Sequence, residues 1–181
     1  MKKILIAAVA LLTCVCASAQ SAADLAASLE RLANLKDCNS SYPKSIGVAA
    51  IDNYTSTVYR LSNAVIETGN DLHALTAKVQ GGEKVDAKTV LSLSASIADE
   101  GLEAADLVKA GELAVAKEKE LVEAAKNVKN PLQKAKAAAD AAKATNAVAY
   151  TLKAAPIVVE ESVAQGKMVK ELSDAIKAKK N

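Results

Sequence analysis

The 181-residue sequence contains no Phe and no Trp, and its four Tyr give an aromatic content of only 2%. Three Pro and seven Gly leave few turns. β-Sandwiches and barrels need aromatic and β-branched residues and frequent turns, so this composition argues against them. Catalytic groups are equally scarce, because there are one His, three Cys and no glycine-rich loop. These absences argue against most classes of enzyme.

Alanine is the abundant residue, with 39 copies in the chain. It has the highest helix propensity of all residues, and its small side chain lets helices approach closely. We therefore predict an all-α fold, an elongated antiparallel bundle of three to five long amphipathic helices with coiled-coil-like packing. Residues 20–181 are expected to form a single domain.

The N-terminus has the three parts of a secretory signal. Met1-Lys2-Lys3 is basic, residues 4–16 are almost entirely apolar, and Ala17-Ser18-Ala19 is a small-residue cleavage site. We predict that residues 1–19 are removed and that the protein is periplasmic, outer-membrane-associated or secreted in a bacterium. Leu11-Leu12-Thr13-Cys14 also resembles a lipobox, so a lipoprotein acylated at Cys14 is the alternative. No later apolar run reaches the length of a transmembrane helix.

Loss of Lys2 and Lys3 with the signal leaves 21 basic and 21 acidic side chains. A chain without net positive charge is a poor nucleic-acid binder, so we predict no nucleic-acid partner. The charge is uneven, with a net −4 over residues 20–105 and a net +4 over residues 106–181. The basic stretch at residues 126–153 is either a solvated face beside an acidic neighbour or a patch for an anionic surface, such as a peripheral membrane contact.

Apolar residues between positions 51 and 79 alternate in spacings of three and four, which is a heptad register held over four heptads. Its members are Ile51, Tyr54, Val58, Leu61, Val65, Thr68, Leu72, Leu75 and Val79. Thr68 is the only polar residue among them. The pattern predicts one helix over residues 45–79 that continues through Gly69-Asn70. Its seam is expected to bind a partner protein or a second copy of the chain.

A second register predicts a helix over residues 86–129 with Asp86 as its N-cap. Its polar members Glu100 and Glu118 indicate either buried residues that fix helix pairing or a register shifted by one. Asn130-Pro131 marks the next boundary, and Pro156 is expected to kink or end the helix that follows. We expect helices at about residues 22–36, 45–79, 86–129, 131–154 and 156–178, the last marked by Val159, Val163, Val169, Leu172 and Ile176.

Few side chains remain as candidates for a functional site. His73 lies off the heptad seam, so a surface position is expected. Asp99, Glu103 and Asp106 share one helix face. This face is either a solvated, ion-paired surface or a site for a cation. Cys38 lies in a polar segment that resembles an exposed loop, so we expect an unpaired thiol, with a disulfide-linked dimer as the alternative. The sequence predicts no catalytic, cofactor-binding or metal-binding residue.

The functional expectation follows from the export signal and the scarcity of site chemistry. We expect a non-catalytic helical-bundle protein of the bacterial cell envelope with a structural or protein-interaction role. The alternative is a periplasmic binder of amphiphiles, either lipids or unfolded client proteins, because amphipathic helices with a basic stretch can cover apolar ligands.

Overall fold

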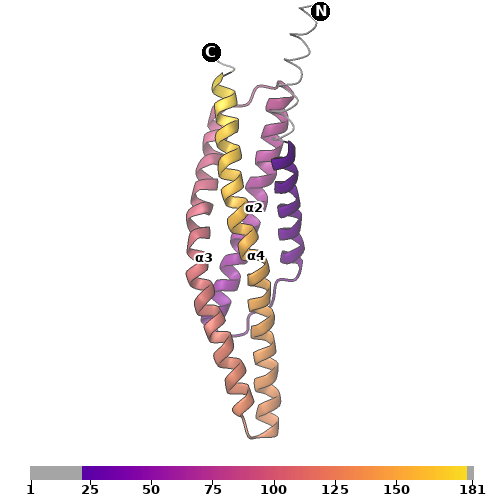
Figure 1. Ribbon diagram of the computed structural model, residues 1–181, viewed down its shortest axis with the longest axis vertical. Coiled ribbons are helices and arrows are strands. Elements are labelled where there is room, and N and C mark those ends of the chain that lie inside the picture. The colour runs from indigo at the N-terminus through magenta and orange to yellow at the C-terminus, as the bar shows by residue number, and fades with distance from the viewer. Residues whose placement is uncertain (1–21, 179–181) are drawn as a thin grey trace, which may run out of the picture.

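The chain folds into an elongated antiparallel bundle of helices, as the composition predicts (Figure 1). The structure, a computed structural model, describes residues 22–178, and these include no β-strand. A first helix spans residues 22–40. Three longer helices follow it: α2 (Ala49–Gln80), α3 (Ala87–Asn127) and α4 (Pro131–Ala178). The predicted signal and Cys14 lie outside the described residues.

The molecule has two parts of different thickness. α2 runs beside α3 and α4 along the wider part of the molecule, where the shorter first helix covers part of their length, and we call this part the four-helix body (Figure 1). At one end α3 and α4 continue beyond the other two helices and are joined by a short turn (Figure 1). We call residues 118–143 the distal hairpin. Ala125 and Ala141 are the only residues buried in the distal hairpin, so it adds little to the hydrophobic core.

The core of the four-helix body consists of two apolar clusters. The larger cluster includes Leu35, Val58 and Leu61, and the smaller one includes Leu72, Ile97 and Leu172. Each long helix changes from one cluster to the other at a buried polar residue. These residues are Thr68 on α2, Glu100 on α3 and Gln165 on α4.

The predicted register of α2 is confirmed, because each of its members is buried except the half-buried Leu75. The helix also continues through Gly69 as expected. Its predicted start at residue 45 is wrong, since α2 begins at Ala49. Gly47 adopts a φ of 80°, which favours glycine and interrupts the helix. The Asp52 carboxylate accepts hydrogen bonds from the backbone amides of Ile46 and Gly47 and thereby fixes this loop.

The first helix is longer than predicted, and this changes the setting of Cys38. Residues 37–40 are helical rather than part of a loop. Cys38 is half-buried and packs against the larger apolar cluster, because it continues the inner stripe of Leu32 and Leu35. The thiol forms no disulfide within the described chain. A disulfide between two chains stays a prediction.

The Asp86 cap of α3 is confirmed, since its side chain accepts a hydrogen bond from the Lys88 amide at 3.1 Å. Asn130 caps α4 in the same way through the amides of Leu132 and Gln133. The expected end of a helix before Pro156 is wrong, because α4 continues through this residue to Ala178, while a kink there stays a prediction. Pro156 is exposed, so the hydrogen bond that it cannot donate lies on the solvent side of the helix.

The stripe predicted for the last part of α4 is confirmed at Val169 and Leu172, which are buried, but its first part is displaced. Val163 is 56% exposed, whereas Val158, Glu161 and Gln165 are fully buried. The inner face of this part of α4 therefore contains a carboxylate and an amide where the sequence pattern suggested valines. Both polar side chains belong to a hydrogen-bond network that crosses the core.

Candidate functional site

A layer of polar side chains crosses the four-helix body between the two apolar clusters. Every helix contributes to this polar layer. Its members are Ser28 and Arg31 on the first helix, Thr68 and His73 on α2, Glu100 on α3, and Glu161 and Gln165 on α4.

Glu161 is the charged centre of the polar layer, and none of its surface is exposed. Arg31 Nε donates a hydrogen bond to Glu161 Oε2 at 2.7 Å. Ser28 Oγ donates to Oε1 at 2.5 Å, and Gln165 Nε2 also donates to Oε1, at 3.2 Å. A buried carboxylate is tolerated only when its charge is paired and its lone pairs are occupied, and these contacts meet both conditions.

Gln165 connects Glu161 to α2. Its Nε2 donates to the backbone oxygen of Val65 at 2.8 Å, and its Oε1 accepts from Thr68 Oγ1 at 2.9 Å. Gly69 allows α2 and α4 to approach each other this closely. A Cβ atom at Gly69 would lie 2.7 Å from Gln165 Nε2 and 2.8 Å from Leu32 Cδ1. The glycine therefore serves close packing between helices.

Thr68 and Glu100 form the far end of the polar layer, with Thr68 Oγ1 and Glu100 Oε2 at 3.0 Å. Burial raises the pKa of Glu100, the hydrogen bond with Thr68 opposes this shift in part, and the nearby charges of Glu103 and Glu67 add to it. Ile97 and Ala104, the register positions before and after Glu100, are buried as well. The predicted register therefore holds at Glu100, which is a buried polar residue within it.

Ser28, His73 and Glu161 bring together the residue types of a hydrolase triad, but in a different order of contacts. In a triad the carboxylate orients the imidazole, and the imidazole takes the proton of the serine. Here Ser28 Oγ donates directly to Glu161, and His73 Nε2 lies 2.9 Å from the same Oγ. Ser28 is fully buried. The arrangement is a structural hydrogen-bond network.

The expected surface position of His73 is wrong. The side chain is half-buried and reaches across to the first helix, where it contacts Ser28. Burial lowers the pKa of His73, and the negative charge of Glu161 opposes this shift in part. Burial therefore favours the neutral form of the imidazole.

The acidic face of α3 is exposed. Asp99, Glu103 and Asp106 all face solvent, and Glu103 forms an ion pair with Arg60 of α2. Within residues 22–178 no group of three His, Cys, Asp or Glu side chains is placed to hold a metal ion.

A groove of about 740 Å³ lies between α3 and α4 in the four-helix body. Its walls are mostly apolar and include Leu107, Val115, Leu152, Ala155 and Val159. The buried ring of Tyr54 also lines the groove. Gly111 leaves room for this ring, because a Cβ there would lie 2.8 Å from the Tyr54 hydroxyl oxygen. Glu112, Lys119 and Glu160 supply charges at the rim.

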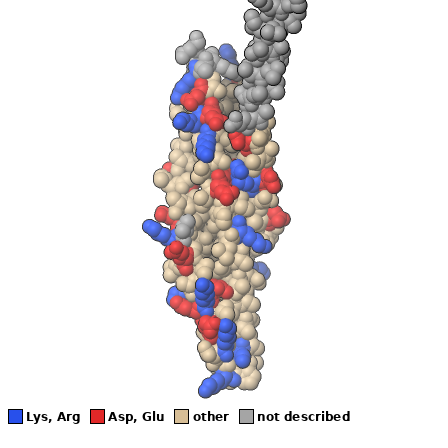
Figure 2. All heavy atoms as spheres, in the orientation of Figure 1, with Lys and Arg blue, Asp and Glu red and all other residues tan. Residues whose placement is uncertain are grey.

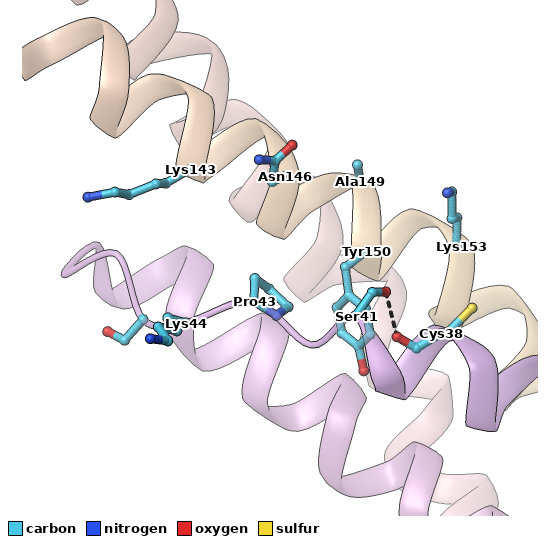
Figure 3. A pocket seen from close by; sticks show the side chains of 10 residues that line it. Cys38, Ser41, Pro43, Lys44, Lys143, Asn146, Ala149, Tyr150 and Lys153 are labelled. Carbon is cyan, nitrogen blue, oxygen red and sulfur yellow. Dashed lines mark hydrogen bonds between the residues drawn. The ribbon is translucent and has the colours of Figure 1, made fainter. Parts of the chain in front are cut away.

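A second cleft, of about 660 Å³, lies between α4 and the loop that follows the first helix (Figure 3). Lys44, Lys143 and Lys153 line it together with Cys38 and Tyr150. Tyr150 donates its hydroxyl proton to Asn39 Oδ1 at 2.9 Å, and burial raises the pKa of this hydroxyl. The ring of Tyr42 packs against Tyr59 and Tyr150, so the aromatic side chains anchor the loop to the bundle.

The outer face of α3 carries three exposed leucines. Leu91, Leu102 and Leu113 are 68%, 72% and 54% exposed and follow one another at intervals of 11 residues. Eleven residues are close to three helical turns, so all three lie on one side of the helix. The buried residues of α3 lie on the opposite side. Exposed charged side chains, among them Asp106 and Lys109, lie between these leucines, so the outer face of α3 is mixed in polarity and carries three separate apolar side chains.

Comparisons with protein-family models, with curated proteins and with solved structures found no match. No helix within residues 22–178 is both long and apolar enough to span a membrane.

Sequence reasoning missed the polar layer for a specific reason. Ser28 and Glu161 are separated by 133 residues, and no local pattern connects them. The available signal was on α4, where Glu161 and Gln165 are one turn apart and in phase with Val158, Val169 and Leu172. A register drawn through those three apolar residues would have placed both polar side chains inside the bundle.

Proposed function

We propose that this protein is an exported, non-catalytic helical bundle that binds another protein through the outer face of α3. The observation that supports this proposal is the row formed by Leu91, Leu102 and Leu113. Exposed leucines repeated along one side of a helix give a partner helix regularly spaced apolar contacts, with charged side chains between them. The partner would pack one of its helices along α3, because the three leucines follow the helix axis.

The heptad seam of α2, which was expected to bind a partner or a second copy of the chain, is not available for this role. Ile51, Val58, Val65 and Leu72 have no exposed surface, because the chain's own helices cover them. The seam therefore stabilises the bundle, and the surface left for a partner is on α3. The proposed export is based on the signal-like segment at residues 1–19. The protein would then be periplasmic, outer-membrane-associated or secreted. The alternative is a lipoprotein that is acylated at Cys14.

Site-specific photocrosslinking tests the interaction in the cells of origin. A photoreactive amino acid is placed at Leu91, Leu102 or Leu113, and Leu29 serves as the control because it is 52% exposed on another helix. We expect one discrete adduct from each of the three α3 positions and none from position 29. An adduct of twice the chain mass would identify a second copy as the partner. Absence of adducts, or equal labelling at position 29, would refute the proposal.

A second candidate function is the binding of amphiphiles, which the apolar groove between α3 and α4 favours. A groove of about 740 Å³ with a few charges at its rim suits a single acyl chain with a polar head. Ala116→Trp fills the groove from an exposed position. We expect the native protein to enhance the fluorescence of dansylundecanoic acid and the variant to lose this effect at an unchanged Tm. Equal enhancement by both proteins would exclude the groove as the site.

A further inference from the structure

The end of the distal hairpin concentrates positive charge. Residues 124–139 include Lys126, Lys129, Lys134 and Lys136 and no Asp or Glu. Lys126 forms an ion pair with Glu123, at 2.6 Å between exposed side chains. Figure 2 shows the lysines gathered at the narrow end of the molecule. We call residues 124–139 the basic tip.

Glu123 neutralises Lys126 in part, but the turn itself lies away from the acidic side chains of α4. Asp140 lies nine residues beyond Pro131, which is about 13 Å along α4. Charges in physiological salt are screened over about 8 Å, so Asp140 does little to neutralise the turn. The basic tip therefore keeps a positive local field although the mature chain has no net charge.

The basic tip also carries an exposed apolar side chain. Leu132 is 83% exposed in the first turn of α4, more than any other large apolar residue described. An exposed leucine flanked by lysines on both sides is the chemistry of an interfacial membrane anchor. The apolar group enters the headgroup region, while the lysines stay with the lipid phosphates.

We propose that the basic tip docks end-on on a surface of anionic lipid, with Leu132 inserted and the four lysines against the headgroups. The long axis of the bundle then stands away from the surface. This placement leaves the outer face of α3 open, because Leu91 and Leu102 lie further up the four-helix body. Docking by the basic tip does not depend on the proposed protein interaction.

Sedimentation with large vesicles tests the proposal. The probe vesicles contain equimolar phosphatidylcholine and phosphatidylglycerol, and the reference vesicles contain phosphatidylcholine alone. We expect the protein to bind the anionic vesicles and to be released by high salt. Each lysine near an anionic surface is worth roughly fivefold in binding. The double variant Lys129→Glu and Lys134→Glu should therefore lower binding by at least about 25-fold.

Matched controls separate docking at the tip from binding elsewhere on the molecule. Leu132→Ser should weaken vesicle binding several-fold, whereas Leu91→Ser removes an exposed leucine on the four-helix body and should have no effect. Lys170→Glu reverses an exposed charge near the opposite end of α4 and should also be neutral. Ala116→Trp should bind vesicles normally, which distinguishes the tip from the groove. Circular dichroism melts confirm that each variant is folded.

Three results would overturn the proposal. The first is equal binding to neutral and anionic vesicles, and the second is normal binding by the double lysine variant. The third is binding that is indifferent to Leu132→Ser and is fully displaced by soluble polyphosphate, since this would identify a soluble polyanion as the ligand.

Discussion

The four-helix body and the distal hairpin are made of similar helix-forming residues but differ in what they bury. The body encloses leucines, valines and a complete polar layer. In the distal hairpin alanines and lysines predominate, and two helices lie against each other without a third. Alanine buries little apolar area, so each of its contacts contributes little free energy. The packing of α3 and α4 is therefore expected to contribute much more free energy in the four-helix body than in the distal hairpin.

The largest expected difference concerns core leucines. Leu61→Ala in the body should lower the free energy of unfolding by about 2–5 kcal/mol, because Leu61 is only 1% exposed and its truncation leaves a cavity. Leu121→Ala in the hairpin should cost less than about 1.5 kcal/mol, since Leu121 is half-buried. Urea unfolding measures both. Equal losses would show that the hairpin is as well packed as the body.

Arg31→Met tests the charged centre of the polar layer. The substitution keeps an apolar stem but leaves the Glu161 carboxylate buried without its cation. We expect a loss of about 2 kcal/mol, below the usual 3–5 kcal/mol for a broken buried pair, because Arg31 is 25% exposed. The double variant Arg31→Met with Glu161→Gln should recover part of that loss. A double variant as unstable as the sum of the two single variants would contradict this account.

Two glycines on long helices should respond in opposite ways to substitution by alanine. Gly69→Ala forces a Cβ against Gln165 and Leu32 and should destabilise the protein by about 1–3 kcal/mol. Gly101→Ala meets no atom within 4 Å and should stabilise α3 by about 0.5–1 kcal/mol. Thermal melts of the two variants give the sign directly. A stabilising Gly69→Ala would mean that Gln165 moves aside easily.

The smallest expected effect is a pH dependence from Glu100. Its folded-state pKa is raised above the ordinary value of 4.5, so between these two values the folded state binds more protons than the unfolded state. Stability therefore falls as the pH rises through this window. Glu100→Gln should raise the Tm at pH 7, and the gain should vanish near pH 4.5. The exposed Glu112→Gln serves as the control, and a gain that is independent of pH would contradict the assignment.

Much of the fold was predictable because it depends on local patterns. The register of α2, the Asp86 cap and the Asn130-Pro131 boundary all depend on residues within a few turns of one another. The errors fall where distant contacts prevail. Cys38 is helical because the core extends beneath it, and Pro156 stays inside α4 because its inner neighbours Ala154, Ala155 and Val158 are buried.

The candidate interaction surfaces were also predictable from the sequence only in part. The basic stretch of residues 126–153 and its segment 124–139 without Asp or Glu were visible in the sequence, but only the fold places that segment at one end of the molecule. The three leucines on the outer face of α3 are present in the sequence too. Their exposure became evident only when the seam of Val90, Leu93 and Ile97 had been placed against the other helices.

By itself the sequence determined an all-α chain with long helices, the heptad seam of α2 and the distribution of charge, since helix propensity and periodicity act over short distances. The tertiary structure decided that Ser28, Arg31, Glu161 and Gln165 meet and satisfy one another. Hydrogen-bond satisfaction belongs to the assembled set of helices. A buried carboxylate is unfavourable on any single helix and becomes acceptable only when the other helices bring its partners within reach.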